Sequence, residues 1–139
     1  MLYEIPWRGI RDRNGRIEHR PFVTVQLRTA EGLERHHFLL DSGADSAMAP
    51  RYAFPDIGIP WSRGKLQVIK GVARKRGSQV VGRVHEELAI ISDTYHWLTL
   101  PKCFVNGDVP FVMGRQVFFD LFHVCFDKSR LMTILETRE

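Results

Sequence analysis

Short alternations of apolar and polar residues dominate the chain, and this pattern predicts strands rather than helices. Val23, Val25 and Leu27 alternate with polar residues in one such segment, and a glycine-containing turn follows. The chain then returns through the β-rich residues 33–40. We therefore expect an antiparallel hairpin whose second strand ends in an apolar run immediately before Asp41.

Turn signals between β-rich segments predict three further hairpins. Asn14–Gly15, the strongest kind of short hairpin signal, lies between two extended segments. Residues 66–69 and 80–91 are the expected arms of a long hairpin whose tip is rich in glycine and charge. The last two strands flank a turn at residues 127–130. These pairings would place strands along most of the chain.

Two segments outside the hairpins also have strand character. Residues 96–105 (HWLTLPKCFV) predict one strand, or two strands broken at Pro101. Residues 109–113 predict a short buried strand that ends at Gly114.

The best helix candidate is residues 115–123, where apolar side chains recur at intervals of three and four: Val117, Phe118, Leu121 and Phe122. No repeat, linker or low-complexity stretch divides the chain. We expect a single all-β domain over residues 1–139, with one short C-terminal helix. Residues 1–20 would form an N-terminal extension with its own hairpin.

Composition is that of an ordinary globular domain, with 139 residues, 44% of them hydrophobic and 26% charged. The net charge of +4 and the pI of about 9.4 raise the possibility of nucleic-acid binding. Only residues 73–77 (ARKRG) form a local basic cluster, however, and a solvated loop explains it more simply. We expect no nucleic-acid partner.

Cysteine content and the ends of the chain bear on its location. Cys103 and Cys125 are too few for a disulfide scaffold, and their apolar neighbours predict buried free thiols. The N-terminus lacks an apolar signal core, and no stretch is as long as a membrane helix. We expect a cytoplasmic protein without a membrane partner.

Metal and cofactor motifs are missing from the sequence. The six histidines and two cysteines show no CxxC, HxxxH or HExxH spacing, so structural roles are expected for them. No glycine-rich phosphate loop opens a helix. We expect neither a metal nor an organic cofactor.

Asp41 raises a different question, because it ends the apolar run Phe38–Leu40. An Asp after a strand often caps a turn, and Ser42–Gly43 suits a turn, so a structural role is one reading. The other reading is catalytic. Burial of the strand end would desolvate the carboxylate, and Gly43 would let a ligand approach the backbone closely.

A catalytic Asp41 would need a partner. Hydrolysis of a peptide bond by carboxylates requires one group that takes a proton from water and another that gives one to the carbonyl oxygen. Two close carboxylates that share a proton supply both states. Asp41 is the one Asp in an Asp-Ser/Thr-Gly triplet. The second carboxylate would therefore come from a second copy of the chain across a two-fold axis.

Two segments together resemble the retropepsin-like aspartic proteases. Residues 38–47 (FLLDSGADSA) match the family's active-site segment, in which an apolar run precedes Asp, Ser or Thr, Gly and Ala. Residues 110–127 (PFVMGRQVFFDLFHVCFD) match its second mark, an apolar strand followed by Gly-Arg and a short helix. The resemblance covers roughly residues 20–135 and implies a closed or partly open β-barrel that is active as a C2 homodimer.

The resemblance also assigns roles to single residues. It implies that Asp41 is the catalytic aspartate and that the following residues support the active-site loop: Ser42, Gly43 and Ala44. It implies that Asp45 pairs with Arg115 beside the site, and a guanidinium can bridge a carboxylate in this way. Met113 and Gly114 belong to the second motif.

The long hairpin, about residues 64–84, resembles the flap that closes over substrate in this family. Residues expected to cover the substrate are Ile69, Lys70, Gly71, Val72 and Ala73. The basic tip departs from the glycine-rich, apolar tips of viral flaps. We therefore expect a homodimeric aspartic endopeptidase that acts on polypeptides. The alternative is a peptide-binding or assembly domain of the same fold with weak or no catalysis.

Overall fold

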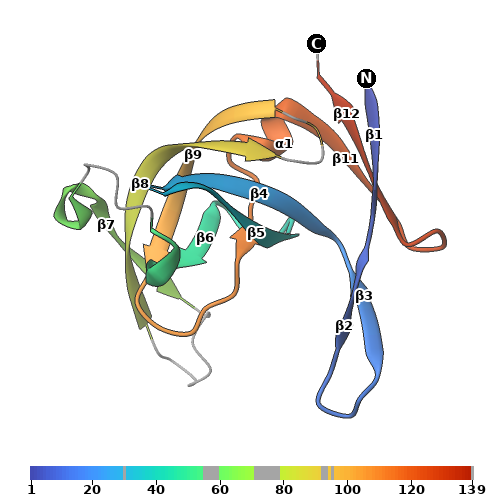
Figure 1. The fold of residues 1–139 in the computed structure, drawn as a ribbon, viewed down its shortest axis with the longest axis horizontal. Coiled ribbons are helices and arrows are strands. Elements are labelled where there is room, and N and C mark those ends of the chain that lie inside the picture. Colours follow the sequence, from blue (N-terminus) through green and yellow to red (C-terminus); the bar gives the residue numbers. More distant parts are fainter. Residues whose placement is uncertain (30, 55–59, 71–78, 92–93, 95, 139) are drawn as a thin grey trace.

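The computed structural model describes residues 1–29, 31–54, 60–70, 79–91, 94 and 96–138. Strands account for most of this part of the chain, and its one α-helix is short (Figure 1). In chain order the elements are β1 (Leu2–Pro6), β2 (Arg8–Arg11), β3 (Ile17–Arg20), β4 (Phe22–Thr29), β5 (Gly32–Leu40), β6 (Ala47–Pro50), η1 (Arg51–Ala53), η2 (Trp61–Arg63), β7 (Lys65–Lys70), β8 (Gln79–Ile91), β9 (His96–Val105), β10 (Val112–Met113), α1 (Phe118–Leu121), β11 (Phe122–Asp127) and β12 (Met132–Thr137).

The main sheet has the strand order β4-β5-β10-β6-β9-β8-β7, and β8 pairs with β4 as well. Most neighbours are antiparallel, but β10 runs parallel to β5 and β6 runs parallel to β9. These parallel pairs bring together segments that are far apart in the sequence. One of them, β5 with β10, joins the two segments that contain the predicted motifs.

The expected hairpins are all present. β2 pairs with β3 around a turn in which Gly15 has a φ of 76°, a value that favours glycine. β4 pairs with β5, β7 with β8, and β11 with β12. The hairpin of β2 and β3 extends away from the rest of the chain (Figure 1).

A separate three-stranded sheet joins the two ends of the chain, in the order β1-β12-β11. β1 pairs with β12 from Leu2↔Glu136 to Pro6↔Met132, so the N- and C-termini lie side by side (Figure 1). Trp7 extends the contact, since its indole N–H donates to the Thr133 hydroxyl at 2.9 Å. The N-terminal extension therefore covers one edge of β12.

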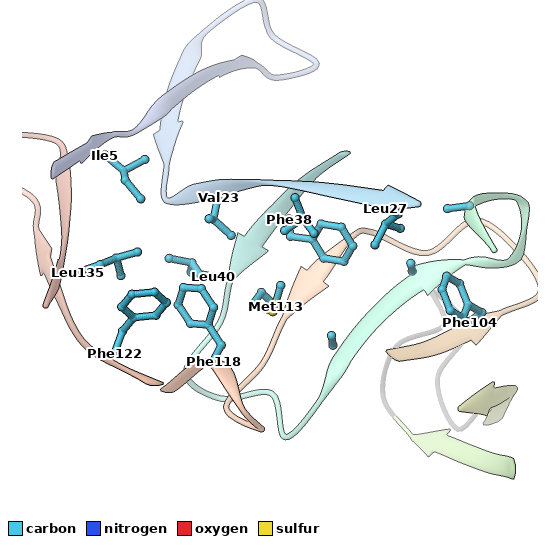
Figure 2. Close-up of a cluster of buried hydrophobic side chains, with 14 residues drawn as sticks. Ile5, Val23, Leu27, Phe38, Leu40, Phe104, Met113, Phe118, Phe122 and Leu135 are labelled. Carbon is cyan, nitrogen blue, oxygen red and sulfur yellow. The ribbon is translucent and has the colours of Figure 1, made fainter. Parts of the chain in front are cut away.

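The core extends from Ile5 and Leu135 of this terminal sheet to Leu27 and Phe104 of the main sheet (Figure 2). Val23, Val25 and Leu27 are fully buried, so the predicted inner face of β4 is confirmed. Leu40 and Met113, which immediately precede Asp41 and Gly114, join the same cluster as Phe118 from α1 (Figure 2). Packing in the core therefore fixes the positions of Leu40 and Met113, and with them the start of each loop.

One open expectation about the elements is settled and another was wrong. Residues 96–105 form one strand rather than two, because β9 runs through Pro101. The pairing of β9 with β6 begins only at Lys102, so on that side Pro101 needs no donor. The helix expected over residues 115–123 is limited to α1, since Phe122 already pairs with Thr137 as the first residue of β11.

The expectation of two buried thiols is half right. Cys103 is buried, and burial raises the pKa of its thiol. Cys125 is exposed. Side chains alternate along β11, and its inner face is taken by Phe122 and Val124, so Cys125 points outward.

The terminal sheet allows a matched test of the core. Leu135→Ala in β12 removes a fully buried side chain and should lower the free energy of unfolding by about 2–5 kcal/mol. Leu2→Ala makes the same change in β1, where the side chain is 62% exposed, and should change it by about 0.5 kcal/mol or less. Urea unfolding measures both, and equal losses would contradict the assigned core.

His85 should make stability depend on pH. Its ring is buried against Phe54 and Trp61, and this burial lowers its pKa below the usual value. In the unfolded chain, the His85 ring therefore binds a proton near the usual histidine pKa of about 6.5. In the folded chain, the same ring binds a proton only at lower pH. The contribution of His85 to stability is present above that pH and is lost as pH falls toward the lowered pKa.

The measurement is urea unfolding between neutral and mildly acidic pH. As the pH is lowered, the free energy of unfolding of the wild type should decrease. In His85→Gln it should decrease less steeply. His19→Gln, which changes an exposed ring on β3, should keep the wild-type slope. A His85→Gln slope as steep as that of the wild type would exclude His85 as the cause.

Candidate active site

The site is positioned by a parallel pairing of two buried strand ends. Leu40 of β5 stands opposite Met113 of β10, and both are almost fully buried. The next residue continues the ladder, because the Asp41 N–H donates to the Met113 carbonyl oxygen at 3.0 Å. Asp41 and Gly114 therefore leave the core together, although they are far apart in the sequence.

A tight turn orients the Asp41 carboxylate. The Gly43 N–H donates to Asp41 Oδ1 at 2.8 Å, and the Ala44 N–H donates to the Asp41 carbonyl oxygen at 3.2 Å. Within the described part of the chain, nothing donates to Oδ2. Ser42 is exposed, and its hydroxyl has no hydrogen-bond partner there. One carboxylate oxygen is thus held by the backbone while the other stays open.

The expected desolvation of Asp41 is absent from the single chain. Leu40 is buried, but Asp41 itself is exposed. The reason is local, since the turn after Leu40 carries the carboxylate beyond the core. In this structure the carboxylate therefore remains exposed to water.

The Gly-Arg segment is tied to the Asp41 loop along its backbone. The Arg115 N–H donates to the Ala44 carbonyl oxygen at 2.9 Å, and the Gln116 N–H donates to that of Asp45 at 2.8 Å. The Arg115 guanidinium also donates to the Asp45 carboxylate. Both side chains are more than half exposed, so this ion pair adds little stability in the single chain. The two backbone bonds do more to fix the loops.

Gly114 is required where the two loops touch. A Cβ at this position would lie 2.6 Å from the Ser46 carbonyl oxygen and 2.7 Å from that of Ala44. Both neighbours are backbone atoms and cannot rotate away. The close approach of the loops therefore depends on a residue without a side chain.

Val117 marks a strained turn just after the Gly-Arg segment. Its φ of 68° and ψ of −53° are rare for a β-branched residue. The Phe118 N–H donates to the Gln116 carbonyl oxygen at 2.8 Å, which completes a γ-turn around Val117. This turn redirects the chain from the site into α1, whose Phe118 is buried in the core.

The arms of the long hairpin reach the same region. β7 and β8 pair from Lys65↔Val84 to Lys70↔Gln79, and the backbones of Ile69 and Lys70 belong to β7. Gly71, Val72 and Ala73 lie outside the described residues. The role of the hairpin as a flap stays a prediction.

A pocket of about 440 Å³ opens beside the Asp41 loop. Its lining comes from four segments, namely the active-site loop, the hairpin arms, the Gly-Arg segment and α1: Asp45, Ser46, Gln67, Val84, Arg115, Gln116 and Asp120. Sequence reasoning identified only Asp45 and Arg115 among these. Strand alternation could have placed Gln67 on the same face as Val84, but nothing in the sequence brings that face to Asp120.

The described residues contain no cluster of three or more His, Cys, Asp or Glu side chains that could hold a metal ion. No helix among them is long and apolar enough to cross a membrane.

The Gly114 contact gives a test of the site's construction. Gly114→Ala should lower the free energy of unfolding by about 1–3 kcal/mol, because the added methyl group separates the two loops. Gly43→Ala is the control, since its Cβ would meet only Asp41 Oδ1, a movable side-chain atom, at 3.2 Å. Chemical denaturation compares them, and a Gly114→Ala protein as stable as the control would contradict the close packing.

Comparison with known proteins identifies the fold. No family model matches the sequence, and no curated protein sequence matches it. Among solved structures, the chain is similar to a retropepsin-like aspartic protease from Rickettsia conorii, with 14% sequence identity and a TM-score of 0.56. The match covers 97% of this chain and 91% of that one. The chain therefore has the fold of a retropepsin-like aspartic protease, and its described residues are mostly β with one short α-helix.

Proposed function

We propose that this chain is one half of an aspartic endopeptidase. The observation that carries the proposal is Asp41, which stands exposed at the end of a buried strand with one oxygen held by the Gly43 N–H. This arrangement occurs within the fold of a retropepsin-like aspartic protease. A turn-capping Asp would be exposed and accept the same bond, so the support for a catalytic role comes from the fold and from the backbone ties between the Asp41 loop and the Gly-Arg segment.

The second half of the site is a second copy of the chain. Asp45, the nearest acid in the sequence, is bonded to Arg115, so it does not serve as the partner of Asp41. One carboxylate cannot be proton acceptor and proton donor in the same step. In a C2 homodimer two Asp41 side chains meet at the axis without any additional sequence.

The proposed mechanism divides the work between the two Asp41 residues. Two carboxylates that close cannot both ionise, so they share one proton. The ionised one takes a proton from a water held between them as that water attacks the scissile carbonyl carbon. The protonated one donates to the carbonyl oxygen. The chain needs no cofactor for these steps.

The architecture suits an extended polypeptide substrate. We propose that the main sheet is a barrel, since β8 pairs with β4 as well as with its neighbours in the strand order. The hairpin of β7 and β8 would cover the site, and in the described residues one edge of β7 has no partner strand. Such an edge can pair with an extended chain. Closure of the hairpin would exclude bulk water.

A second candidate is a peptide-binding or assembly domain with the same fold and weak or no catalysis. The exposure of Asp41 in the single chain favours it, because an unpaired, solvated carboxylate is a poor catalyst. Both candidates bind a peptide. They differ in whether Asp41 also cleaves it.

Replacement of Asp41 separates the candidates. Asp41→Asn should abolish cleavage of a degenerate peptide library while leaving the sedimentation coefficient unchanged, because the amide keeps the shape but cannot exchange the proton. Asp108→Asn makes the same change on an exposed loop and should cleave like the wild type. Full activity of Asp41→Asn would refute the proposed catalyst.

Mixing the Asp41→Asn protein with the wild type tests the shared site within the same experiment. If each dimer needs two aspartates, activity falls with the square of the wild-type fraction. A linear fall would mean that each chain works alone.

A further inference from the structure

The pocket beside the Asp41 loop has an unbalanced charge. It contains three ionisable side chains, and two of them, Asp45 and Arg115, neutralise each other as an ion pair. The third, Asp120, is exposed on α1, and within the described residues its carboxylate has no hydrogen-bond or ion-pair partner. The described part of the lining therefore carries one net negative charge.

The rest of the lining suits a long side chain with a polar end. Val84 offers an apolar contact, and it shares its face of the hairpin with Gln67. The amide oxygens of Gln67 and Gln116 can accept hydrogen bonds near the carboxylate. A lysine or arginine side chain matches this set, because its aliphatic stem packs on apolar surface while its charged end remains solvated.

Among the residues that the structure describes, no cation of the chain itself fills this role. Arg115 is already engaged by Asp45. Lys65 stands opposite Val84 on the hairpin, but it is exposed, and within the described residues it makes no ion pair with Asp120. In this described part of the chain, the carboxylate of Asp120 is left without a cation and can accept one from a ligand.

We propose that this pocket binds a basic side chain of the polypeptide substrate, and that Asp120 sets the preference. The inference deepens the proposed function and rests on it for cleavage, though not for binding. Its location is the main support, since Asp45 and Ser46 of the lining directly follow the Asp41 turn. A substrate side chain there would contact the floor of the site through Asp120 and the hairpin through Gln67.

Binding to an uncleaving protein tests this inference separately from catalysis. The probes are fluorescent, degenerate octapeptides in which one position at a time is fixed as Lys, norleucine or Glu. Fluorescence anisotropy compares Asp41→Asn with the double variant Asp41→Asn/Asp120→Asn. The matched control is Asp41→Asn/Asp108→Asn, which removes the same charge elsewhere on the surface.

At one position, Lys should bind about two- to fivefold more tightly than norleucine at low salt, the size expected of an exposed ion pair. Asp120→Asn should remove this preference, Asp120→Lys should shift it toward Glu, and salt should weaken it. Asp108→Asn should retain it.

The outcomes distinguish this inference from the proposed function. Lys-dependent binding that is lost in Asp120→Asn, with no cleavage by the wild type, would support the pocket and refute the protease. Cleavage without any basic preference would do the reverse. The pocket assignment is overturned if no library binds, if Lys gains nothing at any position, or if Asp120→Asn keeps the preference.

Discussion

The parallel pairing of β5 with β10 is the constraint on which the site depends. It joins two segments that are far apart in the sequence. Both strands leave the core where this pairing ends. Gly114 then allows the loops to touch backbone to backbone, and two further backbone hydrogen bonds hold them there. The geometry around Asp41 is therefore set by main-chain contacts and core packing, so the exposed side chains are free to serve chemistry.

Stability and the proposed chemistry place opposite demands on pH. A carboxylate pair that shares one proton works best in acid, where one of the two groups is protonated. His85 is buried beside Phe54 and Trp61, and its lowered pKa means that acid weakens the fold. The useful pH range of a dimeric enzyme would then be bounded by the dyad on one side and by this buried ring on the other. Association of two chains could offset part of that loss, because binding stabilises the folded state.

The sequence was most informative where a pattern is local. The alternation of Val23, Val25 and Leu27 predicts a buried face, and Asn14–Gly15 predicts a turn, because each signal lies within a few residues. The helix was overestimated because its apolar spacing also fits a turn, a short helix and a strand that packs in the core. Tertiary contacts decide between these, and the strained turn at Val117 has no signal in the sequence.

Site residues also divide into those with a local sequence signal and those that only tertiary contacts bring together. The Asp-Ser-Gly and Gly-Arg segments could be picked out by their own composition, whereas Gln67 and Asp120 become neighbours only through the fold. Gln67 and Asp120 are exposed, as Asp41 is, so water weakens their polar interactions in the single chain. In a single chain water screens all of these charges, and the Asp45–Arg115 pair contributes little. Dimer formation and a bound peptide would exclude that water and strengthen each interaction at once. On this reading, a single chain holds the parts of a site whose electrostatics become effective only in the assembled complex.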